Sequence, residues 1–165
     1  MLNELHVVFG GGQVGQPLAR ILRERGLRVR IARRSAGAPE GVELMRGDAI
    51  HRNFCLEAAR GASTIYHCMN PPYSAQVWAD VIPKYIENLI AAAGNAGARL
   101  VVLESVYMLG RTGGRPMNED TPMKPCSRKA RFAPARPNAC LRRIAAAMYA
   151  LRRDALPIFT APAPQ

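Results

Sequence analysis

A run of glycines lies between the first apolar segment of the chain and its first amphipathic segment. Residues 5–9 (LHVVF) have the composition of a short buried strand, and Gly10-Gly11-Gly12-Gln13-Val14-Gly15 follows directly. Apolar residues then recur at helical spacing up to residue 25. The glycines fit the pattern G-x-G-x-x-G in the strand, turn and helix context that this pattern requires. The chemistry that it predicts is the binding of a pyrophosphate group.

Each part of this turn has a physical reason. Gly10 allows the tight turn, Gly12 lets the backbone approach a pyrophosphate, and Gly15 lets the helix pack close to the strand. Gln13 and Val14 open the helix, whose free N–H groups and positive partial charge attract phosphate oxygens. The alternative is a glycine turn selected only for its geometry. We expect these five residues to contact a dinucleotide cofactor.

Two arginines follow the second apolar run, where a dinucleotide site recognises the adenosine ribose. Sites specific for NAD carry an acid there that receives the ribose hydroxyls, whereas Ala32-Arg33-Arg34-Ser35 contains none. Guanidinium groups match the geometry of a phosphate. The sequence therefore favours NADP over NAD, with Arg33 and Arg34 as ligands of the 2′-phosphate; a solvated basic turn is the alternative.

Short apolar runs alternate with helical patterns through the first hundred residues. We expect strands at 5–9, 28–32, 42–45, 63–68 and 99–103, and helices at about 14–25, 53–60 and 76–93. Pro83 predicts a kink or break early in the last helix, which Gly94 and Gly97 should end. The alternation predicts right-handed βαβ units and, with the glycine turn at the first crossover, a Rossmann-type α/β fold. This is a three-layer, doubly wound parallel sheet of order 3-2-1-4-5, which we expect to be incomplete after the fifth strand.

These features resemble the NAD(P)-dependent epimerase/dehydratase family, the extended and atypical short-chain dehydrogenases. Besides the glycine turn, the resemblance rests on Gly47-Asp48, on the segment 66–72 (YHCMNPP) and on the segment 103–110 (LESVYMLG). It covers about residues 4–129. The usual family turn has three glycines, each three residues apart, and Phe9 stands at the first of those places. The turn is therefore closer to the general dinucleotide fingerprint.

The resemblance implies roles for several residues outside the glycine turn. It implies that Asp48 hydrogen-bonds the adenine, and that the segment with His67 and Asn70 runs beneath the ribose and nicotinamide. His67 should position groups rather than transfer protons. Ser105 stands five residues before Gly110, where the family places a Ser or Thr that hydrogen-bonds a substrate oxygen. A helix-capping Asp48 and an ordinary strand-end Ser105 are the alternatives.

The proton-transfer pair of the family, Tyr-x-x-x-Lys, is missing from this chain. None of the five tyrosines has a lysine four residues later. Lys129 occupies the approximate place of the tyrosine, and Tyr107 is a possible substitute.

Two function classes remain open. One is an oxidoreductase or epimerase/dehydratase that acts on a small hydroxylated or keto compound, including nucleotide sugars. The other is a non-catalytic NAD(P) sensor or an inactive fragment; atypical members of the family also lack the tyrosine.

Charge and composition divide the chain into two parts. The formal net charge of +11 contains +4 from residues 1–127 (15 Lys/Arg, 11 acids) and +7 from residues 128–165 (eight Lys/Arg, one acid). A +4 domain requires no polyanion, so we expect no nucleic acid partner. Scattered Cys and His residues and the lack of a long apolar run predict a cytoplasmic protein with no metal and no membrane contact.

Residues 130–165 contain no glycine and are rich in Arg, Ala and Pro. We expect this segment not to be the native continuation of the 1–129 domain and the chain to have little or no turnover.

Overall fold

A computed structural model describes residues 4–103, 106–118, 120–122, 124 and 126 of the chain. The side chains of Tyr107 and Met108 are not described. The predictions for Ser105, for Lys129 and for the segment 130–165 lie outside the described residues.

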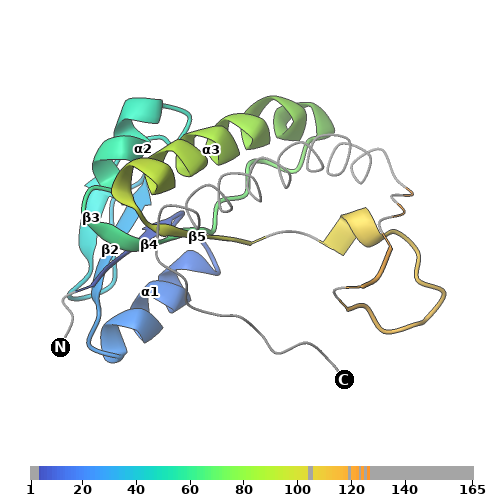
Figure 1. Ribbon diagram of the computed structural model, residues 1–165, viewed down its shortest axis with the longest axis horizontal. Coiled ribbons are helices and arrows are strands. Elements are labelled where there is room, and N and C mark those ends of the chain that lie inside the picture. The colour runs from blue at the N-terminus through green and yellow to red at the C-terminus, as the bar shows by residue number, and fades with distance from the viewer. Residues whose placement is uncertain (1–3, 104–105, 119, 123, 125, 127–165) are drawn as a thin grey trace, which may run out of the picture.

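Five parallel strands form one sheet of order β3-β2-β1-β4-β5 (Figure 1). They are β1 (Leu5–Phe9), β2 (Arg28–Arg33), β3 (Glu43–Arg46), β4 (Ala62–His67) and β5 (Arg99–Val102). Phe9, the last residue of β1, pairs with Ala32 on β2 and with His67 on β4. The carboxyl ends of the three central strands therefore meet at one edge of the sheet. The predicted Rossmann-type order is confirmed.

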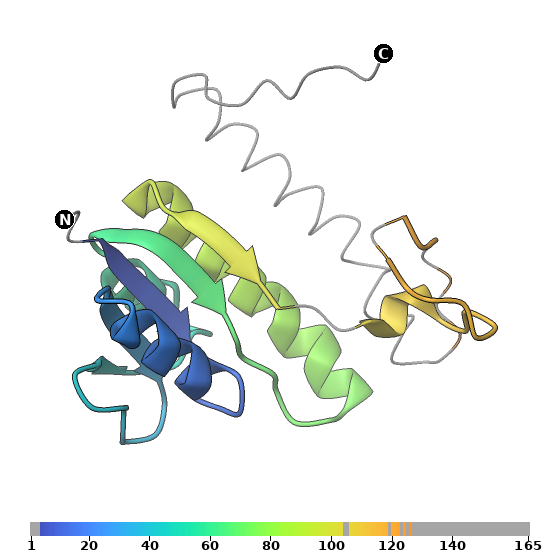
Figure 2. The ribbon, with the colours of Figure 1, turned by 90° about the horizontal axis from the view of Figure 1, so that it is seen from below.

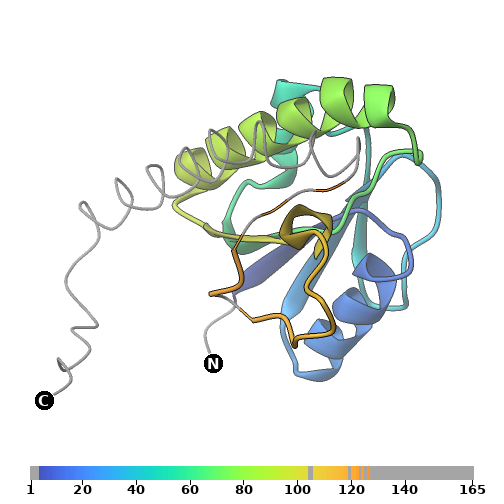
Figure 3. The same cartoon turned by 90° about the vertical axis from the view of Figure 1, so that its right-hand side faces the viewer.

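Helices cover both faces of this sheet and complete three layers. Helix α1 (Gly15–Glu24) lies on one face, and α2 (Arg52–Ala58) and α3 (Ala75–Ala96) lie on the other (Figures 2 and 3). Alternating side chains of β1 enter the two layers of the core. Val7 and Phe9 pack in the cluster with α2 and α3, whereas Val8 packs in the cluster with α1. A short 3₁₀ helix, η1 (Val106–Leu109), follows β5.

Helix α3 differs from the sequence prediction at two positions. It continues through Pro83 and Gly94 and ends at Gly97, which adopts the left-handed conformation with φ of 63°. The helix is therefore not broken at Pro83, and a kink there stays a prediction. The physical reason is packing: Trp78, Tyr85, Ile86 and Leu89 are all buried along this helix. Tertiary burial of an apolar face outweighs the local preference of one proline.

Candidate dinucleotide-binding site

Two glycines of the turn between β1 and α1 are required by its geometry. Gly10 has φ of 104°, and a Cβ added there would lie 2.7 Å from the carbonyl oxygen of Cys68. A Cβ added at Gly15 would overlap the carbonyl oxygen of Gly10. The turn and the close approach of α1 to β1 therefore both exclude larger residues at these two positions.

Gly12, in contrast, faces open space. A Cβ added there has no atom of the described residues within 4 Å, and Gln13 and Val14 beside it are exposed. Val14 caps α1 without a side-chain hydrogen bond, and the first turn of α1 contains no acid. Gln16 Nε2 donates to the Gly11 carbonyl at 2.9 Å and so holds the inner side of the turn. An uncapped helix N-terminus beside an open glycine fits a pyrophosphate group.

Arg33 lies at the end of β2, directly against the glycine turn. A Cβ added at Gly11 would stand 2.7 Å from Arg33 Cδ and Nη1, so this side chain extends over Gly11. Its guanidinium donates to Ser35 Oγ from Nε at 3.0 Å and from Nη2 at 2.6 Å. Nη1 donates to the Gly37 carbonyl at 3.2 Å. Among the described residues Arg33 has no acidic partner.

Asp48 and Arg34 lie close together just beyond the carboxyl ends of β3 and β2. Arg34 Nη1 lies 3.8 Å from Asp48 Oδ2, and the Arg34 side chain is 71% exposed. Asp48 Oδ1 accepts from the Ile50 N–H at 3.1 Å, which fixes the turn before α2. The N-cap of α2 is His51, not Asp48. The second carboxylate oxygen of Asp48 is thus held by a weak surface ion pair that a polar ligand could replace.

His67 ends β4 and is almost completely buried, with 4% of its surface exposed. Its Nδ1 accepts from the Met69 N–H at 3.1 Å, and its ring meets the edge of Tyr85. Burial lowers the pKa of His67 to about 4. A neutral imidazole that holds the turn after β4 suits a positioning role better than proton transfer. Asn70, three residues further on, is exposed.

The low pKa of His67 predicts a stability that depends on pH. Between pH 6.5 and about 4 the unfolded chain binds a proton at His67 that the folded chain excludes. Folding should therefore weaken as the pH falls through this window, by up to about 3 kcal/mol from this group. Urea unfolding at a series of pH values measures the loss. His67→Gln should flatten the curve and His51→Gln, at an exposed position, should not; equal curves for the two variants would contradict the assignment.

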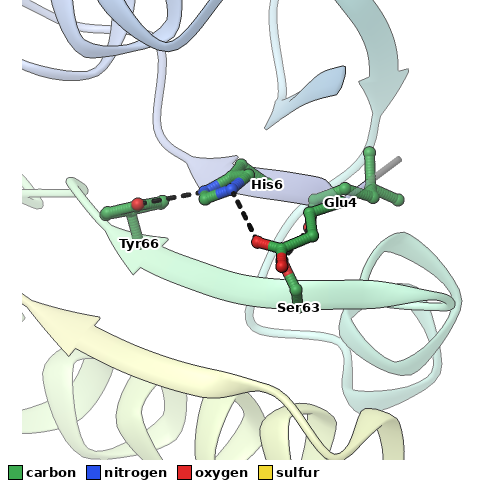
Figure 4. A network of polar contacts seen from close by, with 5 residues as sticks. Glu4, His6, Ser63 and Tyr66 are labelled. Atoms are coloured by element: carbon green, nitrogen blue, oxygen red, sulfur yellow. Dashed lines mark hydrogen bonds and ion pairs between the residues drawn. The ribbon is translucent and has the colours of Figure 1, made fainter. Parts of the chain in front are cut away.

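The structure also contains polar groups that the sequence analysis did not single out. His6 Nδ1 lies 3.1 Å from the Tyr66 hydroxyl, and His6 Nε2 lies 3.9 Å from the Glu4 carboxylate (Figure 4). Ser63 Oγ beside them donates to the Leu5 carbonyl at 3.2 Å. His6 is the second residue of β1, while the glycine turn follows its last residue. This network therefore connects β1 to β4 away from the glycine turn.

Asn88 is the second group that the sequence analysis missed. It is buried in α3, and its Nδ2 donates to the carbonyls of Ala49 and Ile50 at 2.8 and 3.0 Å. These carbonyls directly follow Asp48, so Asn88 anchors the turn that carries the candidate adenine ligand. A polar residue on the apolar face of the predicted helix was the available signal.

Comparison with models of known families shows to which family the chain belongs. The model of the family described as "NAD dependent epimerase/dehydratase family" matches residues 6–135. The chain belongs to this family. No curated protein matches. In the part of the chain that the structure describes, no helix has the length and apolar character needed to cross a bilayer.

Solved structures share the fold over most of this chain. The structure of gox2253 is 27% identical with a TM-score of 0.71, and covers 85% of this chain and 47% of its own. MoeE5, solved with UDP-glucose and NAD, is 26% identical with a TM-score of 0.67 and coverages of 87% and 48%. The UDP-N-acetylglucosamine 4-epimerase of Bacillus cereus is 17% identical with a TM-score of 0.69, and covers 87% and 50%. The chain thus spans about half the length of these relatives.

Proposed function

We propose that this chain forms the NAD(P)-binding domain of an oxidoreductase or epimerase/dehydratase. Its substrate would be a small hydroxylated or keto compound, with nucleotide sugars as the first class to test. The observation that carries the proposal is the glycine turn, which is closed at Gly10 and Gly15 and open at Gly12. MoeE5 was solved with UDP-glucose and NAD, which supports this choice of substrate class.

Different groups of residues would bind different parts of the cofactor. The glycine turn and the N-terminus of α1 would hold the pyrophosphate, and Asp48 would accept a hydrogen bond from the adenine. The turn held by His67, with Asn70, would lie beneath the ribose and nicotinamide. The bound nicotinamide supplies hydride transfer. Ser105 would hydrogen-bond the substrate oxygen at which charge develops, with Tyr107 and Lys129 as candidates for proton transfer.

We also propose that the chain prefers NADP to NAD. Arg33 lies at the glycine turn without an acidic partner among the described residues, and Arg34 has only a 3.8 Å contact with Asp48. Two guanidinium groups at this place favour a 2′-phosphate. They lack the hydrogen-bond acceptors that an acid would present to the ribose hydroxyls of NAD.

Replacing Arg33 and Arg34 together with alanine should reduce the affinity for NADP⁺ by about 1–3 kcal/mol and that for NAD⁺ much less. The reason is that the double variant removes the two charges proposed to face the 2′-phosphate, a group that NAD⁺ lacks. Calorimetric titration of each cofactor measures the two changes. Arg28→Ala with Arg60→Ala is a matched control, since both side chains are exposed, Arg28 begins β2 and Arg60 lies two residues before β4. Equal losses for both cofactors would refute the preference.

A dinucleotide sensor is the second candidate function, favoured by the missing Tyr-x-x-x-Lys pair. Incubation of the chain with NADPH and a panel of carbonyl compounds and nucleotide sugars separates the two. Consumption of NADPH with at least one compound would exclude the sensor and would contradict the little or no turnover expected of this chain, whereas binding without consumption agrees with the sensor.

A further inference from the structure

The turn after β2 is folded around a single hydroxyl group. Ser35 Oγ receives two hydrogen bonds from Arg33, at 3.0 Å from Nε and 2.6 Å from Nη2. Gly37 completes the turn with φ of 93° and accepts from Arg33 Nη1 at 3.2 Å. The guanidinium plane of Arg33 is therefore fixed by two neutral acceptors within its own turn.

This arrangement leaves Arg33 both charged and available. A guanidinium has five N–H donors, and three of them are engaged here, which leaves one on each terminal nitrogen without a partner among the described residues. Hydroxyl and carbonyl oxygens fix the orientation of the group without neutralising it. Each of these two donors can form a charge-assisted hydrogen bond with a phosphate oxygen.

We propose that Ser35 is a positioning residue that orients Arg33 for the 2′-phosphate and thereby sets the preference for the phosphorylated cofactor. The inference rests on the proposed NADP preference and assigns the cause of it to a second residue. A free arginine side chain loses rotamer freedom when it binds. Ser35 fixes that side chain before the cofactor arrives, so its contribution should appear only where a phosphate meets Arg33.

Ser35→Ala should weaken NADP⁺ binding by about 3- to 10-fold, the scale of one or two hydrogen bonds, and NAD⁺ binding by less than about twofold. Ser35→Thr keeps the hydroxyl and should restore NADP⁺ affinity to within about twofold of the parent chain. Calorimetry with both cofactors gives the two constants, and thermal unfolding without cofactor checks that the fold is unchanged. Equal weakening for both cofactors, or no rescue by threonine, overturns the inference.

The combination with Arg33→Ala separates positioning from direct contact. In the Arg33→Ala background, Ser35→Ala should have no further effect on NADP⁺ affinity, because the group that it orients is gone. A full additional loss means that Ser35 contacts the cofactor itself and overturns the inference while the NADP preference stands. Arg33→Ala without any effect on NADP⁺ binding overturns the proposed preference, and the role of Ser35 with it.

Discussion

Replacing Gly12 with valine is expected to abolish dinucleotide binding while the domain stays folded. No atom of the described residues lies within 4 Å of an added Cβ at Gly12, so the fold can accept the larger side chain. The branched side chain would instead occupy the space through which the pyrophosphate approaches the turn. We expect the affinity for NADP⁺ and NAD⁺ to fall at least about 100-fold, with the free energy of unfolding changed by less than about 1 kcal/mol. Calorimetry and urea unfolding measure the two quantities.

Gly94→Val is the matched control for this experiment. Gly94 is exposed on α3, and in the part of the chain that the structure describes a Cβ added there also has no atom within 4 Å. This variant should bind both cofactors like the parent chain. If Gly12→Val binds dinucleotide as well as the parent, the phosphate site lies elsewhere and the proposed function is wrong.

The strand order could be predicted from the sequence because alternating strand and helix patterns leave few topologies. A right-handed crossover at each step and a glycine turn at the first one are sufficient for order 3-2-1-4-5. The same logic places Gly10 and Gly15 correctly, since a left-handed φ and a helix in contact with the backbone both require glycine. Local rules failed at Pro83, where burial of one helix face outweighs the cost of the proline.

The contacts of the candidate site depend on geometry that no local pattern contains. The sequence indicates that Arg33 is basic and follows a strand, but its bonds to Ser35 require the shape of the turn at Gly37. The same holds for the hydrogen bond of Asn88, because its partner Ala49 lies 39 residues earlier in the chain. A buried amide on an apolar helix face shows that a partner exists and gives no information on which one it is.

Asn88→Asp is expected to give the largest loss of stability. The substitution keeps the shape of the side chain but replaces the Nδ2 amide group with a carboxylate oxygen, which is an acceptor. In the parent chain Nδ2 donates to the Ala49 and Ile50 carbonyls at 2.8 and 3.0 Å. Two carbonyl oxygens would then face a buried carboxylate, which should destabilise the domain by about 3–5 kcal/mol at pH 7. Urea unfolding of the variant and the parent measures this difference.

The dependence on pH shows whether hydrogen bonding is the cause. Burial beside two carbonyls should raise the pKa of the new carboxyl in the folded state, so its protonation favours folding. The deficit should therefore be largest at neutral pH and shrink as the pH falls toward the unfolded value of about 4, where a carboxyl O–H can serve one carbonyl. Asn95→Asp, exposed on the same helix, should lose less than about 1 kcal/mol. Similar losses for Asn88→Asp and Asn95→Asp, or a deficit independent of pH, would show that the Asn88 amide does not anchor the Asp48 turn.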